Sequence, residues 1–205
     1  MRMKEAKKMN KAKEQLKKDL DILKAMVEEL TNYLSSEAIF WPMFKADYPQ
    51  MTLGGYFMRQ RRLQILSYLL SEAEQAELKG ILIQFGDMTM DRKAVLVKKG
   101  LEELRMRLNQ WKGHLQDYWE SETIEKEFYA TDAEVRTMIA DLIFELDIDL
   151  YQVDKELLEQ MDALDETLSR NWQEGDFIWP EDWIPAYGKG EYWWLYGEPR
   201  IPDHY

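Results

Sequence analysis

The sequence predicts an all-α fold: an elongated bundle of four or five helices with a long antiparallel helix pair and an ordered C-terminal tail. Three observations predict it. All six prolines of the 205 residues lie outside residues 50–179, and proline inside a helix costs about 3 kcal/mol. Residues 1–35 hold neither proline nor glycine. Apolar residues recur at intervals of three and four along much of the chain, which is the period of a helix with one buried face.

The first helix is predicted over residues 4–34, where apolar residues from Leu16 to Leu34 follow this period. Its first half is polar, since residues 1–24 hold nine basic and four acidic side chains. We expect that half to project from the body of the protein. A solvated helix end is the simplest interpretation of its positive charge.

Residues 36–51 are predicted to form a connector, because Trp41 and Tyr48 each precede a proline and such residues avoid helical backbone. The segment also carries apolar side chains that include Phe44. We expect these side chains to lie against the bundle.

Two helices, or one kinked helix, are predicted between residues 53 and 85. Thr52 is a suitable N-cap for a helix over 53–70. Ser71 and Glu74 have the spacing of a capping box, which begins a second helix that Gly86 would end. The alternative is a single kinked helix over 53–85.

The next helix is predicted over residues 91–120, whose apolar positions alternate at intervals of three and four from Ala94 to Tyr118. A fifth helix is predicted to begin at a second capping box, Thr131 and Glu134. From Val135 to Trp172 its apolar residues repeat every eleven positions, which keeps an apolar stripe nearly straight. We therefore expect one continuous helix of about 40 residues, about 60 Å long. Its length is the reason to expect an elongated molecule.

A chain of this length predicts a single domain over residues 1–205. Within it the expected segments are the N-terminal helix 1–35, the connector 36–51, a helical core 52–172 and an aromatic tail 173–205.

Composition excludes several classes of function. The chain has no cysteine and two histidines, which removes thiolate chemistry and leaves little for imidazole-based catalysis. Its net charge of −12 argues against binding nucleic acid through the whole surface. No run approaches the 18 apolar residues of a membrane span, and the first 20 residues are charged throughout. We expect a cytoplasmic protein that binds neither membrane nor nucleic acid and needs no cofactor.

Asp141 and Glu145 are weak candidates for metal ligands, because they are four residues apart and share a helix face. Helical di-iron sites use Glu-x-x-His pairs, and this chain has none. A solvated acidic face is the simpler interpretation. His114 is a candidate acid or base with Asp117 or Glu120 as its partner, although a hydrogen-bonded or solvent-edge histidine is the simpler interpretation.

The tail is the most unusual segment, since ten of the 34 residues from Trp172 onward are aromatic. Disordered segments are poor in aromatic residues, so the tail should be ordered. Either it folds back over the helices, or its rings form a binding surface. The candidate binding residues are Trp183, Tyr187, Tyr192, Trp193 and Trp194.

No motif in the chain specifies a reaction. The function that the sequence favours is non-enzymatic, a helical protein that contacts a protein partner or a second copy of itself, for example as a homodimer. The alternative is a small-molecule or metal site between the fourth and fifth helices and the tail, lined by His114, Asp141, Glu145 and tail aromatic residues. A third hypothesis is that the acidic fifth helix mimics nucleic acid for a basic partner.

Overall fold

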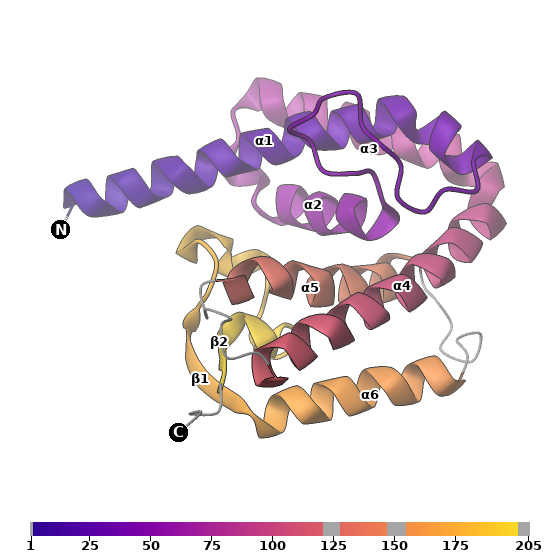
Figure 1. The fold of residues 1–205 in the computed structure, drawn as a ribbon. Coiled ribbons are helices and arrows are strands. Elements are labelled where there is room, and N and C mark those ends of the chain that lie inside the picture. Colours follow the sequence, from indigo (N-terminus) through magenta and orange to yellow (C-terminus); the bar gives the residue numbers. More distant parts are fainter. Residues whose placement is uncertain (1, 121–127, 147–154, 201–205) are drawn as a thin grey trace. The chain divides into compact units, whose positions relative to one another are not determined.

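A computed structural model describes residues 2–120, 128–146 and 155–200. This part of the chain is mostly helical and carries one small sheet (Figure 1). The elements are α1 (Arg2–Ser35), α2 (Leu53–Ile65), α3 (Glu72–Thr89), α4 (Lys93–Glu120), α5 (Tyr129–Glu145), α6 (Lys155–Arg170), β1 (Trp172–Phe177) and β2 (Tyr196–Pro199). The predicted helical character is confirmed, whereas the two strands were not expected.

The chain divides into two compact units, Met1–Glu103 and Leu104–Tyr205. Their charges differ in sign: the first unit holds 18 basic and 15 acidic side chains, and the second holds 9 basic and 24 acidic ones. The net charge of the chain therefore comes from the second unit. The organisation as a single domain stays a prediction.

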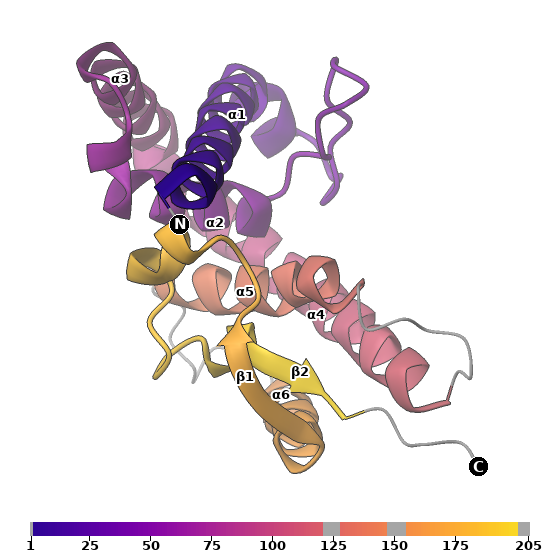
Figure 2. The same ribbon diagram turned by 90° about the vertical axis from the view of Figure 1, so that its left-hand side faces the viewer.

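The first unit is built around α1, against which α2 and α3 pack. The apolar stripe of α1 is fully buried at Leu16, Leu23 and Leu30. Figure 1 shows that α1 runs on past α2 and α3 toward its N-terminus. The connector between α1 and α2 and the helix α3 lie on opposite sides of α1 (Figure 2).

Local signals fixed the starts of α2 and α3. Thr52 caps α2, where its hydroxyl accepts a hydrogen bond from the backbone N–H of Gly55 at 3.0 Å. Ser71 and Glu74 form the predicted capping box. Because a 3₁₀ turn (Ser67–Leu69) separates the two helices, the alternative of one kinked helix is wrong.

The predicted end of α3 at Gly86 is also wrong, since α3 continues to Thr89. A glycine ends a helix when it adopts left-handed backbone. Among the described residues only Gly197 has a positive φ, so Gly86 keeps the helix going. Glycine inside a helix costs only about 1 kcal/mol.

The continuous fifth helix is the main error of the sequence-based prediction. The chain forms α5 and α6 instead, and Arg136 on α5 donates two hydrogen bonds to Asp165 on α6 at 2.8 and 2.6 Å. In one straight helix these residues would be about 43 Å apart. The segment that joins α5 to α6 lies outside the described residues. The expectation of an elongated molecule loses the helix on which it depended.

The predicted capping box at Thr131 is wrong as well. The helix α5 begins at Tyr129, two residues earlier, and its N-cap residue, Phe128, makes no side-chain capping bond. The apolar stripe from Val135 identified a helix correctly but did not locate its first turn.

The tail forms an antiparallel hairpin of β1 and β2, in which Gln173 pairs with Glu198 and Glu174 with Gly197. Gly197 has a φ of +148°, and a Cβ atom there would lie 2.2 Å from the backbone oxygen of Gln173. This position therefore requires glycine. Two 3₁₀ turns, Glu181–Ala186 and Trp193–Leu195, lie between the strands.

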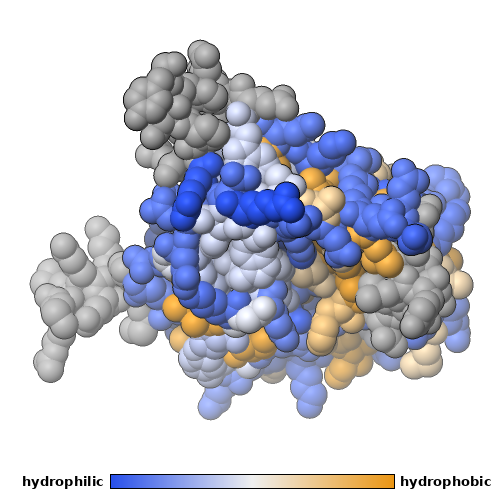
Figure 3. Space-filling view, turned by 90° about the horizontal axis from the view of Figure 1, so that it is seen from below, coloured by the Kyte–Doolittle hydropathy of each residue, from blue (hydrophilic) through white to orange (hydrophobic). Residues whose placement is uncertain are grey.

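Hydrophilic residues, in blue, cover much of the face shown in Figure 3, with smaller groups of hydrophobic residues in orange.

Candidate functional site

Four of the five aromatic residues predicted to form a binding surface are buried. Trp183, Tyr187, Tyr192 and Trp194 are at most 5% exposed, and Trp193 is half-buried. Their rings contact one another edge to face, with centroids 5.1 Å apart for Tyr187 and Tyr192 and 5.4 Å apart for Tyr192 and Trp194. Such contacts are favourable between aromatic rings. The rings therefore form the core of the tail.

The tail is tied to α5 through the polar ends of these aromatic side chains. Tyr192 donates its hydroxyl hydrogen to Asp141 at 2.6 Å, and the indole N–H of Trp194 donates to Thr137 at 3.2 Å. Tyr129 on α5 donates to the backbone oxygen of Trp194 at 2.8 Å. Burial raises the pKa of Tyr129 well above its ordinary value, so this hydroxyl stays a donor. Of the two interpretations of the tail, folding back on a helix is the one these contacts support.

Arg136 joins α5, α6 and the tail. Its guanidinium group donates a hydrogen bond to each carboxylate oxygen of Asp165 and lies 4.0 Å from the ring centroid of Trp194. A planar guanidinium group can make two parallel hydrogen bonds to a carboxylate and stack on an aromatic ring, which a lysine ammonium group cannot do. Arg136 is buried, so its positive charge interacts with groups of the second unit.

His114 lies with Asp132, in the first turn of α5, rather than with Asp141. Its Nδ1 is 3.4 Å from one oxygen of Asp132, and Tyr118 donates to the other oxygen at 2.8 Å. Burial, followed by the hydrogen bond to Asp132, raises the pKa of Tyr118. Asp132 and Asp141 are nine residues apart on one helix, or about 14 Å along its axis.

The residues proposed for a metal or small-molecule site therefore do not meet. Asp141 faces the tail through Tyr192, whereas His114 pairs with Asp132. Glu145 lies about one turn beyond Asp141, half-buried at the end of α5. Within the described residues, no group of three or more histidine, aspartate or glutamate side chains is arranged to hold a metal ion.

Buried charges also hold the first unit together. Asp19 on α1 accepts a hydrogen bond from Arg62 at 2.8 Å and lies 3.3 Å from Arg59. Glu103 is fully buried, and both of its carboxylate oxygens lie 3.2 Å from the backbone N–H of Gly54 at the start of α2. A carboxylate at a helix N-terminus is stabilised by the helix dipole. Arg59 and Arg62 of α2 thus serve packing within this unit.

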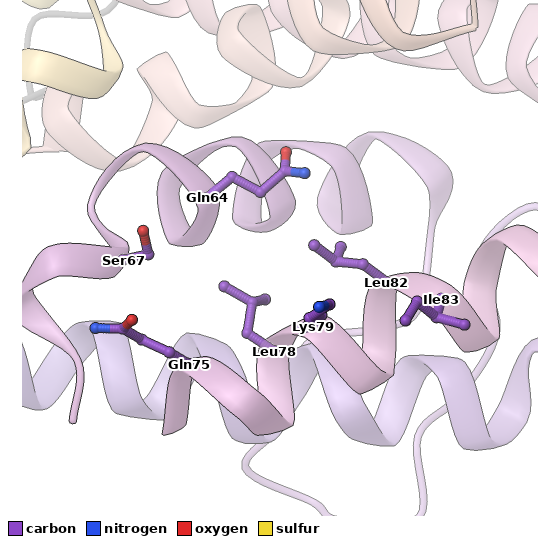
Figure 4. Close-up of a pocket in the computed structure, with 7 residues that line it drawn as sticks. All are labelled: Gln64, Ser67, Gln75, Leu78, Lys79, Leu82 and Ile83. Carbon is purple, nitrogen blue, oxygen red and sulfur yellow. The ribbon is translucent and has the colours of Figure 1, made fainter. Parts of the chain in front are cut away.

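Sequence reasoning missed a surface groove in the first unit. The groove measures about 450 Å³ and lies between the end of α2 and the length of α3 (Figure 4). Its lining consists of Gln64, Ser67, Gln75, Leu78, Lys79, Leu82 and Ile83. Ile83 is 55% exposed, so a large aliphatic side chain of the lining faces solvent. The only charged side chain of the lining is Lys79, for which the described residues offer no ion pair.

A signal for this groove was present in the sequence of α3. One buried stripe of a helix holds apolar residues at intervals of three and four. The sequence of α3 has apolar residues at three consecutive positions as well, namely Ile81, Leu82 and Ile83, after Leu78. Leu78 and Ile81 are buried, whereas Ile83 faces solvent. The surplus apolar residue marks the exposed side of the helix.

The connector displays a second exposed apolar side chain, Phe44, which is 90% exposed. This contradicts the expectation that Phe44 lies against the bundle. Trp41 and Met51 close the loop by exchanging backbone hydrogen bonds of 3.0 and 2.8 Å. The backbone pair fixes the ends of the loop that carries Phe44.

Comparisons with protein-family models, curated proteins and solved structures find no match to this chain. In the part of the chain that the structure describes, no helix combines the length and the apolar character needed to cross a membrane.

Proposed function

We propose that the protein is non-enzymatic and acts through protein–protein contact, with a second copy of the same chain as its partner. The groove between α2 and α3 is the observation that carries this proposal. It has an aliphatic floor, opens to solvent, and contains no acidic side chain in its lining. Exposed apolar patches with polar edges are typical of protein contact sites.

Two further apolar side chains near the end of α2 are exposed. Ile65 is 40% exposed and Tyr68, in the turn that follows, is 63% exposed. Tyrosine is among the residues enriched where proteins bind one another. The groove and these flanking side chains belong to the same unit, so one association event can cover all of them.

Self-association is favoured over an unrelated partner by the charges of the chain. The first unit has a basic excess and the second an acidic excess. Regions of opposite sign on two copies can attract each other at long range in suitable orientations, in addition to the contact at the groove. The cytoplasmic location and the homodimer expected from the sequence stay predictions.

The alternative, a small-molecule or metal site between α4, α5 and the tail, has less support. Tyr192 already satisfies one oxygen of Asp141 at 2.6 Å. His114 lies with Asp132, about 14 Å away along the helix. The geometry therefore favours a structural role for these residues.

Two measurements test the proposal. Light scattering coupled to gel filtration should give an average mass that exceeds the 24.6 kDa monomer and rises with loading concentration. Thermal unfolding should not shift when divalent cations or nucleotides are added. A constant monomer mass at the highest concentration would contradict self-association, and a clear thermal shift would favour the alternative.

A further inference from the structure

We infer that the copies associate head to tail, with Phe44 of one copy seated in the α2–α3 groove of the next. This inference rests on the proposed function, because it presupposes that the protein self-associates. It adds the contact surface, the segment that occupies it and the symmetry of the assembly.

Phe44 has the properties of an inserting side chain. Its ring is 90% exposed, although the loop that carries it is closed by the Trp41–Met51 backbone pair. Its neighbour Lys45 is held within the loop, where its ammonium group lies 3.1 Å from the hydroxyl of Tyr48 and 4.6 Å from the centre of that ring. The loop is thus ordered around an uncovered phenyl ring.

The groove suits such a ring. Leu78, Leu82 and Ile83 provide an aliphatic floor along α3 (Figure 4). Its volume is about 450 Å³, and it is open to solvent. A phenyl ring with part of its loop therefore fits, and covering Ile83 removes exposed apolar surface from both partners.

Charge complements the apolar contact. Asp47 lies three residues after Phe44 and is exposed, and Lys79 lies at the edge of the groove. The described residues offer neither of them an ion pair. Two lysines of α1 are already paired with acidic residues of α3, Lys17 with Glu74 and Lys24 with Glu77. A Phe44 ring in the groove brings Asp47 of the same loop near Lys79.

The positions of the two surfaces determine the symmetry. The connector and α3 lie on opposite sides of α1 (Figure 2). A copy that inserts its loop into a neighbour's groove therefore leaves its own groove free on the far side. Such a heterologous contact does not close between two copies, and it builds chains or rings. The assembly should grow with concentration beyond a dimer.

Four variants of the full-length chain test this inference by sedimentation velocity. Phe44→Ala removes the ring, and Ile83→Glu places a charge on the groove floor; each should weaken association at least about tenfold. The matched controls are Phe128→Ala and Met106→Glu, which change exposed apolar residues of the second unit and should associate like the wild type. Since the targeted side chains are exposed, all four variants should remain folded by circular dichroism.

A charge reversal tests the pairing independently. Lys79→Glu and Asp47→Lys should each weaken association a few-fold, because each places like charges in contact. The double variant Asp47→Lys/Lys79→Glu should regain most of the wild-type association, since every contact then has opposite charges again. A wild-type chain that stays monomeric would overturn both the proposed function and this inference. A wild-type chain that associates while Phe44→Ala and Ile83→Glu behave like their controls would overturn this inference alone.

Discussion

Tyr192 and Asp141 show how single residues attach the tail to a helix. The hydroxyl of Tyr192 donates to a fully buried carboxylate oxygen of Asp141 at 2.6 Å. Hydrogen bonds to charged groups contribute more than neutral ones, and a buried carboxylate that loses a donor is left with its desolvation cost. The aspartate that suggested a metal ligand in the sequence thus has a structural function.

Replacing Tyr192 by phenylalanine should lower the free energy of unfolding by about 1.5–3 kcal/mol. The ring and its edge-to-face contacts remain, so the loss reports the hydrogen bond to Asp141. Urea denaturation followed by circular dichroism measures it. Tyr68→Phe is the matched control, because that side chain is 63% exposed, and it should change stability by less than about 0.5 kcal/mol. Equal effects of the two changes would contradict the structural function of the Tyr192 hydroxyl.

Gly197 gives a second residue-scale prediction. Its φ of +148° and the contact that a Cβ would make with Gln173 mean that Gly197→Ala should destabilise the protein by at least about 2 kcal/mol. Gly188→Ala is the control, since no atom lies within 4 Å of a Cβ built there. The midpoint of thermal unfolding distinguishes the two variants. A stable Gly197→Ala protein would show that the hairpin is not formed as described.

At the scale of elements, α3 depends on the capping box at its start. Glu74 accepts hydrogen bonds from Lys17 and from the backbone and side chain of Ser71, and these contacts lower its pKa from 4.5 to about 2. Because the folded pKa is the lower one, the stabilisation is present above about pH 4.5 and is lost as the pH falls toward 2.

The variant Glu74→Gln should therefore be less stable than the wild type at neutral pH, and the difference should shrink below about pH 4.5. Since the pair lies near the surface, solvent screening keeps the difference small. Denaturant titrations at a series of pH values measure it. Glu72→Gln is the control: it removes a charge from the same helical turn but no capping contact. A difference between Glu74→Gln and the wild type that grows toward low pH would contradict this assignment.

The pair of α5 and α6 gives the clearest test of the fold at this scale. Cysteine can be introduced at Thr131 and Ser169 and spin-labelled selectively, since the chain has no cysteine of its own. A continuous helix would place these residues about 57 Å apart, whereas the contact between α5 and α6 places them within about 25 Å. Pulsed electron spin resonance measures this distance. Labels at Arg105 and Gln116, both within α4, provide a control at about 16 Å.

The elements that sequence reasoning predicted correctly depend on neighbouring residues. The caps at Thr52 and Ser71 act over three residues, and the apolar stripe of α1 repeats within a turn or two. The local signals at Gly86 and Thr131 were wrong by a few residues, but the largest errors involve distant residues. The apolar stripe from Val135 to Trp172 is compatible with one helix or with two, and Arg136 and Asp165 distinguish these only by meeting in space. The hairpin of β1 and β2 likewise pairs residues 19 to 27 positions apart.

The candidate site also depends on contacts between distant residues. The sequence showed that the tail aromatic residues need a cover but could not show that α5 provides it through Asp141 and Thr137. It also could not locate the α2–α3 groove, because Gln64 and Ile83 come to line one groove only when the two helices fold together.

At the scale of the whole molecule, charge and exposed apolar surface are distributed unevenly. The first unit carries the groove, the exposed Phe44 and a basic excess, whereas the second unit carries the buried aromatic core and most of the acidic charge. The net charge of −12 keeps copies apart on average, so association requires a specific contact. The Phe44 loop and the groove provide one.

The most direct test of this account is sedimentation velocity on an equimolar mixture of Phe44→Ala and Ile83→Glu, from about 1 to about 200 μM. One variant retains the groove and the other retains the loop, so only one productive contact exists between them. Head-to-tail contact predicts that each variant alone associates at least about tenfold more weakly than the wild type, while the mixture forms a dimer of the 24.6 kDa chain that grows no further. A mixture that remains monomeric, or that grows beyond a dimer, would contradict it.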